Sequence, residues 1–163
     1  MSLLLSGKTA LVTGGTRGIG QAIAHRMRNA GADVIITGTK PIESGYQGFT
    51  YWPADFSDRK AVDSLVQTLI AREVDILVNN AGINKIGSFA EIDPVDFDRI
   101  QAVNLHGPMR LCQAVIPGMR RKKWGRIVNV ASIYGVVRKE KRASYTASKF
   151  ALDGLTASLA AEV

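Results

Sequence analysis

Tyr145 and Lys149 are the residues whose types and spacing point most directly to acid–base chemistry. They lie four positions apart in a segment with a helical apolar pattern, so both side chains project from one face of a helix. A free tyrosine has a pKa of about 10 and exchanges protons poorly near neutrality. A lysine ammonium held beside it favours the phenolate. The pair therefore predicts a proton-transfer site at the start of the last helix.

Ser132 is a third candidate because it follows a β-rich run, Arg126 to Ala131. If that run is a strand, Ser132 lies at the carboxyl edge of a sheet, where open α/β folds bind their ligands. A tyrosine–lysine pair alone is common by chance. Together with Ser132 and the glycine-rich turn described next, the pair predicts carbonyl or alcohol chemistry.

The glycine-rich segment Thr13–Gly20 lies between the first predicted strand and the first predicted helix. Glycines let the backbone turn tightly and approach phosphates, and the N-terminus of the helix offers unpaired N–H groups and a partial positive charge. The position of the turn directly after a strand predicts nucleotide binding. The candidate contacts in this turn are Gly14, Thr16, Arg17, Gly18, Ile19 and Gly20.

The end of the second predicted strand indicates which nucleotide is bound. A carboxylate there would accept a hydrogen bond from the ribose 2′-hydroxyl of NAD and repel the 2′-phosphate of NADP. The sequence instead reads Thr37 to Lys40, without an acid. Arg17 and Lys40 supply positive charge and Thr39 supplies a hydroxyl donor, so NADP(H) is the predicted cofactor.

Short β-rich runs alternate with longer helical segments, which predicts a parallel sheet with crossover helices. Strands are expected at Lys8–Thr13, Asp33–Gly38, Phe49–Trp52, Asp75–Asn79 and Arg126–Ala131. Helices are expected over Gly18–Asn29 with Gly31 as C-cap, from a cap at Ser57 and Asp58 to Ala71, from Pro94 towards Met119, and from Tyr145 to the end. Pro108 and Pro117 should interrupt or bend the third helix, and residues 40–47 should form a loop. The expected fold class is α/β, a Rossmann-type doubly wound parallel sheet.

The composition is that of an ordinary globular protein, with 46% apolar and 21% charged residues among 163. This length suits one domain with its own core. The apolar run Leu3–Leu5 is far too short for a membrane span or a signal sequence, so a cytoplasmic protein without membrane contact is expected. Cys112 is the only cysteine; it predicts no disulfide and no metal site, and should be a small core residue.

Basic residues gather in two groups and account for much of the net charge of +7. The first is Arg120–Lys123 with Arg126, and the second is Arg138, Lys139, Lys141 and Arg142. Such groups suit an acidic protein, a phosphorylated substrate, nucleic acid or simply a solvated surface. No aromatic residues are interleaved as base stacking requires, so nucleic acid is not expected as a partner.

Five segments resemble the motif set of the short-chain dehydrogenase/reductase family: Thr13–Gly20, Asn79–Gly82, Asn104, Ser132 and Tyr145–Lys149. The resemblance covers the whole chain. It implies that Tyr145 donates or removes the proton at the reacting oxygen, while Lys149 tunes Tyr145 and binds the nicotinamide ribose. It also implies that Ser132 holds the substrate oxygen and that Asn104 anchors a water relaying protons to Lys149.

The same resemblance implies further cofactor contacts, namely Asn80, Ala81 and Gly82 at the adenosine ribose and Asp55 and Phe56 at the adenine. The residue patterns leave alternatives open. Asn104 could instead bond backbone at a helix irregularity, Asp55 could be a turn or cap residue, and Asn79 is expected to stabilise the sheet. Family members commonly form tetramers through the helix containing Asn104 and the final helix, so a homo-oligomer (tetramer or dimer) is expected.

The sequence departs from the family pattern in two places. The loop after the second strand lacks the usual helix, and the chain stops at Val163 before the expected sixth and seventh strands and the substrate-covering loop. Residues 1–163 are therefore expected to be a single NADP(H)-binding Rossmann domain truncated within its last helix. Weak cofactor binding and little turnover are expected of it alone, because positioning and water exclusion supply much of the rate.

The leading functional hypothesis is an NADP(H)-dependent carbonyl reductase resembling 3-oxoacyl-thioester reductases, with an acidic acyl carrier docking on Arg120–Lys123 and Arg126. A sugar, polyol or other secondary alcohol remains open as substrate. The alternative from another class is a catalytically silent nucleotide-binding or interaction protein. The expected truncation favours the silent protein, and the intact set of Asn104, Ser132, Tyr145 and Lys149 argues against it.

Overall fold

The computed structural model describes residues 3–41, 46 and 48–163. In this part of the chain, five strands form one parallel sheet in the order β3-β2-β1-β4-β5. The strands are β1 (Thr9–Val12), β2 (Asp33–Gly38), β3 (Thr50–Pro53), β4 (Ile76–Asn79) and β5 (Arg126–Asn129). Each predicted strand is present with small differences at its ends, and the predicted α/β fold is confirmed. Most of the predicted loop over 40–47 lies outside the described residues.

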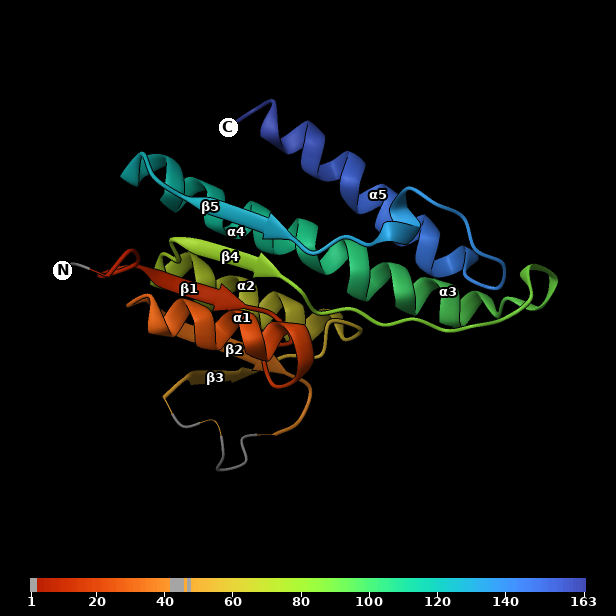
Figure 1. Ribbon diagram of the computed structural model, residues 1–163, viewed down its shortest axis with the longest axis horizontal. Helices are drawn as coiled ribbons and strands as arrows, with labels where there is room; N and C mark the ends of the chain where they lie inside the picture. The colour runs from red at the N-terminus through yellow and green to blue at the C-terminus, as the bar shows by residue number, and fades with distance from the viewer. Residues whose placement is uncertain (1–2, 42–45, 47) are drawn as a thin grey trace.

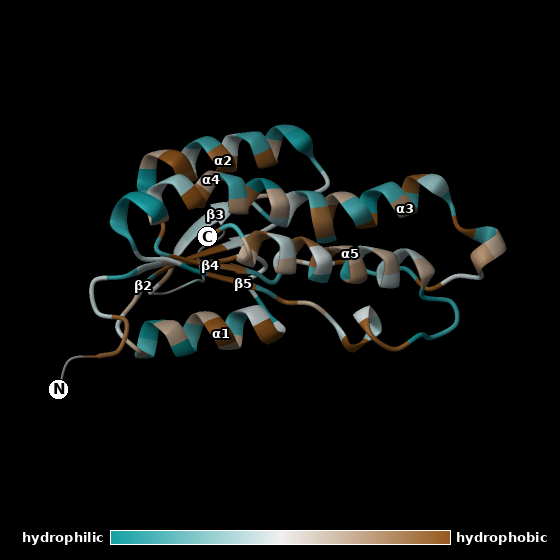
Figure 2. Ribbon diagram, turned by 90° about the horizontal axis from the view of Figure 1, so that it is seen from above, coloured by the Kyte–Doolittle hydropathy of each residue, from teal (hydrophilic) through white to brown (hydrophobic). Residues whose placement is uncertain are grey.

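Helices cover both faces of the sheet. They are α1 (Gly18–Asn29), α2 (Arg59–Arg72), α3 (Pro94–Gln101), α4 (Gly107–Lys122) and α5 (Ala143–Ala160). Figure 2 shows α1 on one face of the sheet and α2 with α4 on the other. None of the helices in the described part of the chain is both long and apolar enough to cross a membrane.

The central strands are apolar on both sides because both faces are covered. Successive side chains of a strand point to opposite faces. Leu11 of β1 and Leu77 of β4 pack with α2 and α4, whereas Val12 and Val78 pack with Ala24 of α1. This two-sided core fixes β1 and β4 next to each other inside the sheet (Figure 1) and so holds the loops that leave their carboxyl ends.

The helix ends agree with the sequence in most places. Asp58 caps α2 by accepting a hydrogen bond from the Lys60 amide, and Gly31 follows α1 with a φ of +96°. The prediction that Ser57 shares the capping of α2 is wrong. Its amide and hydroxyl both donate to the carboxylate of Asp55, at 2.8 and 2.6 Å, so Ser57 belongs to the turn before the helix.

The long helix predicted from Pro94 is divided into α3 and α4 by a π-helical segment, Ala102–His106. The predicted irregularity is therefore present, and it ends two residues before Pro108. The prediction of an interruption at Pro117 is wrong, because α4 continues across that residue to Lys122. Apolar packing outweighs the loss of one helical hydrogen bond there, since Val115 and Met119 on either side are buried in the core.

Cys112 occupies the core position that the sequence predicts, with 4% of its surface exposed. Burial raises the pKa of its thiol to about 11. Because the thiolate is the reactive form, we expect the folded protein at pH 8 to react with a disulfide reagent such as DTNB only on the timescale of unfolding. The denatured protein should release one equivalent of chromophore at once. Rapid labelling of the folded chain would contradict this.

Candidate active site

All strands are parallel, so their carboxyl ends meet at one edge of the sheet. Figure 1 shows the strand arrows pointing towards the side where α3 and the beginning of α5 lie. The turn after β1, the end of β2, the loop after β4 and the segment after β5 all leave from this edge. The residues predicted for cofactor and substrate therefore gather along one side of the molecule.

The turn after β1 packs tightly against the start of α1. Gly14 and Gly18 adopt φ values of +63° and +57°, which favour glycine. A Cβ on Gly20 would lie 2.3 Å from the Gly14 carbonyl oxygen and 2.4 Å from the side-chain nitrogen (Nδ2) of Asn80. Only a residue without a side chain allows the helix to begin this close to the turn.

This contact predicts the effect of one substitution. Changing Gly20 to alanine should destabilise the protein by about 1–3 kcal/mol, because the turn or α1 must shift to admit the methyl group. Gly154 of α5 is the matched control: a Cβ there meets nothing within 4 Å, so Gly154→Ala should be neutral or stabilise by about 0.5–1 kcal/mol. Urea denaturation of the two variants measures both values. Equal stabilities would refute the assigned packing.

The N-terminus of α1 is suited to an anion. Arg17 is its N-cap residue, no side chain caps the helix, and no acidic residue lies in the first turn. By contrast, α2 and α3 are capped by the carboxylates of Asp58 and Asp93. The free N–H groups and the positive end of the helix dipole are therefore available to a phosphate group, and the Arg17 side chain is exposed beside them.

The end of β2 lies against the same turn. The Thr37 hydroxyl accepts a hydrogen bond from the Gly14 amide at 3.1 Å, and the Thr37 carbonyl accepts one from Gly15 at 3.0 Å. A Cβ on Gly38 would lie 2.7 Å from the Thr16 methyl carbon. These contacts bring the exposed residues Thr39 and Lys40 next to the turn that contains Arg17. The stretch Thr37–Lys40 carries no carboxylate to repel a ribose phosphate.

The Thr13 hydroxyl joins the turn to the loop after β4. It accepts hydrogen bonds from the amides of Asn80 and Ala81, both at 2.9 Å. In return, the Asn80 side chain donates to the carbonyls of Thr13 and Gly14, at 2.9 and 3.2 Å. The sequence predicts Asn80 as a ribose contact and includes Thr13 in the glycine-rich segment without assigning it a role. In the structure the Asn80 amide group fixes the shape of the turn, and its predicted contact with ribose stays a prediction.

Asn79 stabilises the sheet, as expected. Its amide donates to the Asn129 side-chain oxygen of β5 at 2.8 Å, and the Asn129 amide donates to the Thr156 hydroxyl of α5 at 2.8 Å. These bonds link β4, β5 and the helix that contains Tyr145 and Lys149. They are buried or half-buried at the ends of the two strands, where they hold β4, β5 and α5 together.

The two predicted adenine contacts are largely engaged within the protein. The Ser57 hydroxyl and amide bind the Asp55 carboxylate and hold its pKa below the usual value. The Phe56 ring is buried in the core, and a Cβ on Gly107 would lie 2.6 Å from it. The alternative interpretation of Asp55 as a turn residue therefore matches the structure, and contacts of these residues with adenine stay predictions.

Tyr145 and Lys149 share one face of the first turns of α5. The Lys149 ammonium lies 5.8 Å from the centre of the Tyr145 ring and donates to the Val130 carbonyl at 2.7 Å. Lys149 is 4% exposed, and this burial lowers its pKa. Tyr145 is half-buried, and among the described residues no group forms a hydrogen bond with its hydroxyl. Its phenol is therefore open to a ligand, whereas the lysine is held in place.

Ser132 follows β5 and caps a short 3₁₀ turn, Ile133–Gly135. Its hydroxyl oxygen accepts a hydrogen bond from the Tyr134 amide at 3.2 Å, which leaves its own hydrogen free to donate. The Tyr134 ring meets the Tyr145 ring edge-on, with 6.5 Å between centres. The capped turn thus holds Ser132 and supports the tyrosine from the side.

Asn104 lies in the π-helical segment and is fully buried. Its side-chain oxygen accepts from the Ile83 amide at 2.8 Å, and its amide donates to the Ile83 carbonyl at 2.9 Å. This matches the alternative in which Asn104 bonds backbone at a helix irregularity. Pro108 has no N–H to donate to the Asn104 carbonyl, so the carbonyl lacks its usual α-helical partner. The predicted water relay stays a prediction and would use that carbonyl.

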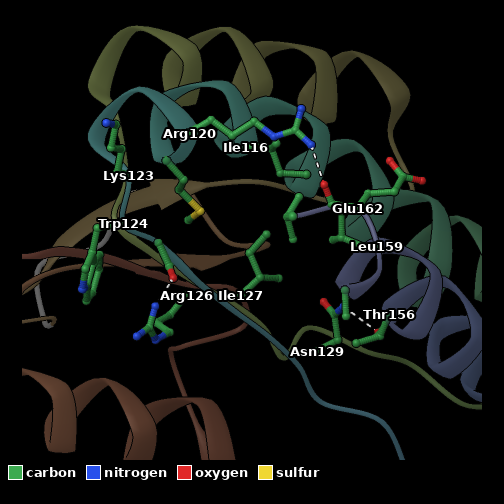
Figure 3. A pocket seen from close by; sticks show the side chains of 14 residues that line it. Ile116, Arg120, Lys123, Trp124, Arg126, Ile127, Asn129, Thr156, Leu159 and Glu162 are labelled. Carbon is green, nitrogen blue, oxygen red and sulfur yellow. Dashed lines mark hydrogen bonds between the residues drawn. The ribbon is translucent and has the colours of Figure 1, made fainter.

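A groove of about 730 Å³ between α4, β5 and α5 contains none of the predicted catalytic or cofactor-binding residues (Figure 3). Ile127 and Leu159 line it together with the basic residues Arg120, Lys123 and Arg126. Arg120 donates to the Glu162 carbonyl at 2.9 Å. The chemistry indicated by Tyr145 therefore lies outside this groove.

Comparisons with known proteins agree with this geometry. A family model described as short chain dehydrogenase matches residues 8–163. D-beta-hydroxybutyrate dehydrogenase of Cupriavidus necator is 37% identical over 164 residues, which cover 94% of this chain and 64% of that protein. The 3-oxoacyl-(acyl-carrier-protein) reductase of Aquifex aeolicus is 36% identical over 177 residues, covering 100% of this chain and 71% of that protein.

One solved structure is similar to this chain in both sequence and fold. The crystal structure of 3-oxoacyl (acyl-carrier-protein) reductase from Agrobacterium tumefaciens with NADP bound has a TM-score of 0.88 and 34% identity, and the match covers 97% of this chain and 65% of that one. The chain spans about two thirds of the length of the curated relatives it matches, 64% and 66% for two of them. With the family model matched from the start of β1 to the end of α5, the chain belongs to the short-chain dehydrogenase family.

Proposed function

We propose that this protein is an NADP(H)-dependent oxidoreductase that reduces a carbonyl group to a secondary alcohol or catalyses the reverse reaction. The observation that carries the proposal is the pair at the start of α5: an unpartnered Tyr145 hydroxyl beside the buried Lys149 ammonium. Ser132, with a free hydroxyl hydrogen, follows β5 at the same edge of the sheet. In this proposal, residues 1–163 act as one NADP(H)-binding unit.

The residues around the first turn fit the cofactor. The uncapped N-terminus of α1 and the tight turn at Gly14, Gly18 and Gly20 suit a pyrophosphate, and Ala81 and Gly82 would line the ribose. Arg17, Thr39 and Lys40 would bind a 2′-phosphate, in line with the NADP bound in the Agrobacterium relative. When bound, the reduced nicotinamide supplies the hydride.

Side chains of this protein would donate and return the proton. The Tyr145 hydroxyl donates its proton to the substrate oxygen, and the nearby Lys149 ammonium stabilises the phenolate that remains. Ser132 donates a hydrogen bond to the same oxygen and so orients the carbonyl. A water on the Asn104 carbonyl would return a proton through Lys149. In the direction of alcohol oxidation, each proton moves the opposite way.

Among carbonyl compounds we favour a 3-oxoacyl thioester. The support is the similarity to two proteins named 3-oxoacyl-(acyl-carrier-protein) reductase. Lys123 and Arg126 form no ion pair with a carboxylate among the described residues, so their charges are available to an acidic acyl carrier. In the same basic group, Arg121 and Lys122 are instead paired with Glu73. A homo-oligomer, tetramer or dimer, also belongs to this proposal.

The test is NADPH oxidation by the purified protein with a β-ketoacyl thioester, simple ketones and keto-sugars, with NADH measured in parallel. We expect turnover that is slow in residues 1–163 alone and that prefers NADPH and the thioester. Faster turnover with keto-sugars would favour a polyol dehydrogenase. The similarity to solved structures titled gluconate 5-dehydrogenase supports this alternative. NADPH binding without turnover on any carbonyl would contradict the proposal and favour a silent nucleotide-binding role.

A further inference from the structure

Ser148 lies inside the Tyr145–Lys149 segment and is completely buried. Its hydroxyl donates to the Tyr145 carbonyl at 2.7 Å and accepts from the Asn104 amide at 3.0 Å. The other hydrogen of that amide goes to the Ile83 carbonyl, and the Asn104 oxygen accepts from the Ile83 amide. Ser148 therefore completes a buried network in which the two amide hydrogens of Asn104 are both used.

This network joins three parts of the candidate site. Ile83 follows Gly82 in the loop after β4, Asn104 belongs to the π-helical segment, and Ser148 belongs to the first turns of α5. A Cβ on Gly82 would lie 3.4 Å from the Asn104 oxygen and 3.7 Å from the Lys149 ammonium nitrogen. The Lys149 ammonium is thus next to the network, although it donates to Val130 and not to any member of it.

We infer that Ser148 is a positioning residue: its hydroxyl fixes the first turns of α5 against Asn104 and thereby sets where Tyr145 and Lys149 stand relative to the loop after β4. This inference rests on the proposed function for its catalytic consequence. Losing the hydroxyl leaves an Asn104 N–H without a partner in a fully buried place, so the surrounding elements must shift to satisfy it. A displacement of that kind moves the reacting groups of Tyr145 and Lys149.

The same helix offers a matched control. The Thr156 hydroxyl, two turns further along α5, accepts from the Asn129 amide at 2.8 Å and donates to the Leu152 carbonyl at 2.6 Å. It thus has the same kinds of partner as Ser148, an asparagine amide and a carbonyl of α5. Its neighbours include neither Tyr145 nor Lys149. Thr156→Val and Ser148→Ala therefore remove the same kinds of bond from one helix, although Ser148 is fully buried and Thr156 is half-buried.

The experiment compares Ser148→Ala, Ser148→Cys and Thr156→Val with the unmodified protein. We expect Ser148→Ala to lower kcat by about ten- to a hundredfold with KM changed less than twofold, as for a displaced catalytic group. Ser148→Cys, which keeps the size and a weak donor, should give a smaller loss and serves as the folded variant if the alanine protein is unstable. Thr156→Val, at a half-buried position, should lower the melting temperature by a smaller amount and leave kcat within twofold.

A second readout does not need turnover. NMR titration of the Lys149 side chain, labelled with ¹³C at Cε, reports its surroundings; among the described residues, burial is the cause of its lowered pKa and Tyr145 is the titratable group facing it. In Ser148→Ala the pKa of Lys149 should rise towards the ordinary lysine value as water gains access, and in Thr156→Val it should stay unchanged.

The outcomes distinguish the positioning role of Ser148 from the proposed oxidoreductase function. Equal kcat losses in Ser148→Ala and Thr156→Val, or a Lys149 titration that is identical in the unmodified, Ser148→Ala and Ser148→Cys proteins, would overturn the positioning role. If the unmodified protein oxidises no NADPH with any carbonyl, the proposed function fails. The Lys149 titration then still decides whether Ser148 sets the geometry of the pair.

Discussion

Replacing Tyr145 with phenylalanine is expected to lower turnover with NADPH by about a hundredfold or more and to leave the NADPH dissociation constant within about threefold. The variant keeps the ring that packs edge-on against Tyr134, so the start of α5 should remain in place. It removes only the hydroxyl, which has no partner among the described residues and is the proposed proton donor. Steady-state kinetics and NADPH fluorescence titration on the same preparation measure the two quantities.

Tyr134→Phe is the control for that experiment. It removes a hydroxyl from the neighbouring ring, 6.5 Å away between centres, and should change kcat by less than about threefold. Similar losses in both variants would show that any phenol near the site matters and that Tyr145 has no special role. A Tyr145→Phe protein with unchanged kcat would remove the tyrosine from the proposed mechanism altogether.

Replacing Arg17 with alanine is expected to weaken NADPH binding by about ten- to a hundredfold and to leave NADH binding unchanged within error. A hydrogen bond to a charged group contributes about 1.5–3 kcal/mol, and about 1.4 kcal/mol corresponds to a tenfold change in affinity. Arg17 is exposed at the uncapped start of α1, next to the acid-free end of β2. Calorimetric or fluorescence titration with each dinucleotide measures the difference.

Arg26, in the last turn of the same helix, supplies the matched control. Arg26→Ala removes the same charge from α1 at the end away from the turn, and NADPH affinity should change by less than about twofold. If both variants weaken NADPH equally, the effect comes from overall charge. If Arg17→Ala weakens NADH as much as NADPH, the arginine interacts with the pyrophosphate and not with the 2′-phosphate.

The sequence predicts those parts of the fold that depend on local pattern. The strands are continuous apolar runs because helices cover both faces, and such runs are visible without any tertiary knowledge. Asp58 before α2 and Gly31 after α1 follow from capping chemistry that involves neighbouring residues. Pro108 indicates an irregular helix, and the π-helical segment ends at His106, two residues before it.

The sequence does not predict how polar side chains are shared between distant elements. Thr13 and Asn80 are 67 positions apart, and only the parallel pairing of β1 with β4 brings them together. Ser57 looks like a cap residue by type, yet Asp55 competes for its amide and hydroxyl. Pro117 would break an isolated helix, but α4 continues across that position, where the residues around it are buried. In each case a tertiary contact overrides a local preference.

The position of β5 at the margin of the sheet has a consequence for how the protein behaves in solution. Among the described residues, no strand pairs with the outer side of β5, and its Val128 is 47% exposed. Unpaired strand edges are templates for joining further chains into a continuous sheet, and a charge on the edge discourages this. Arg126, exposed at the start of β5, supplies such a charge, and the like charges of two copies approaching through this edge repel each other. Salt screens that repulsion, so self-assembly through β5 should increase with ionic strength.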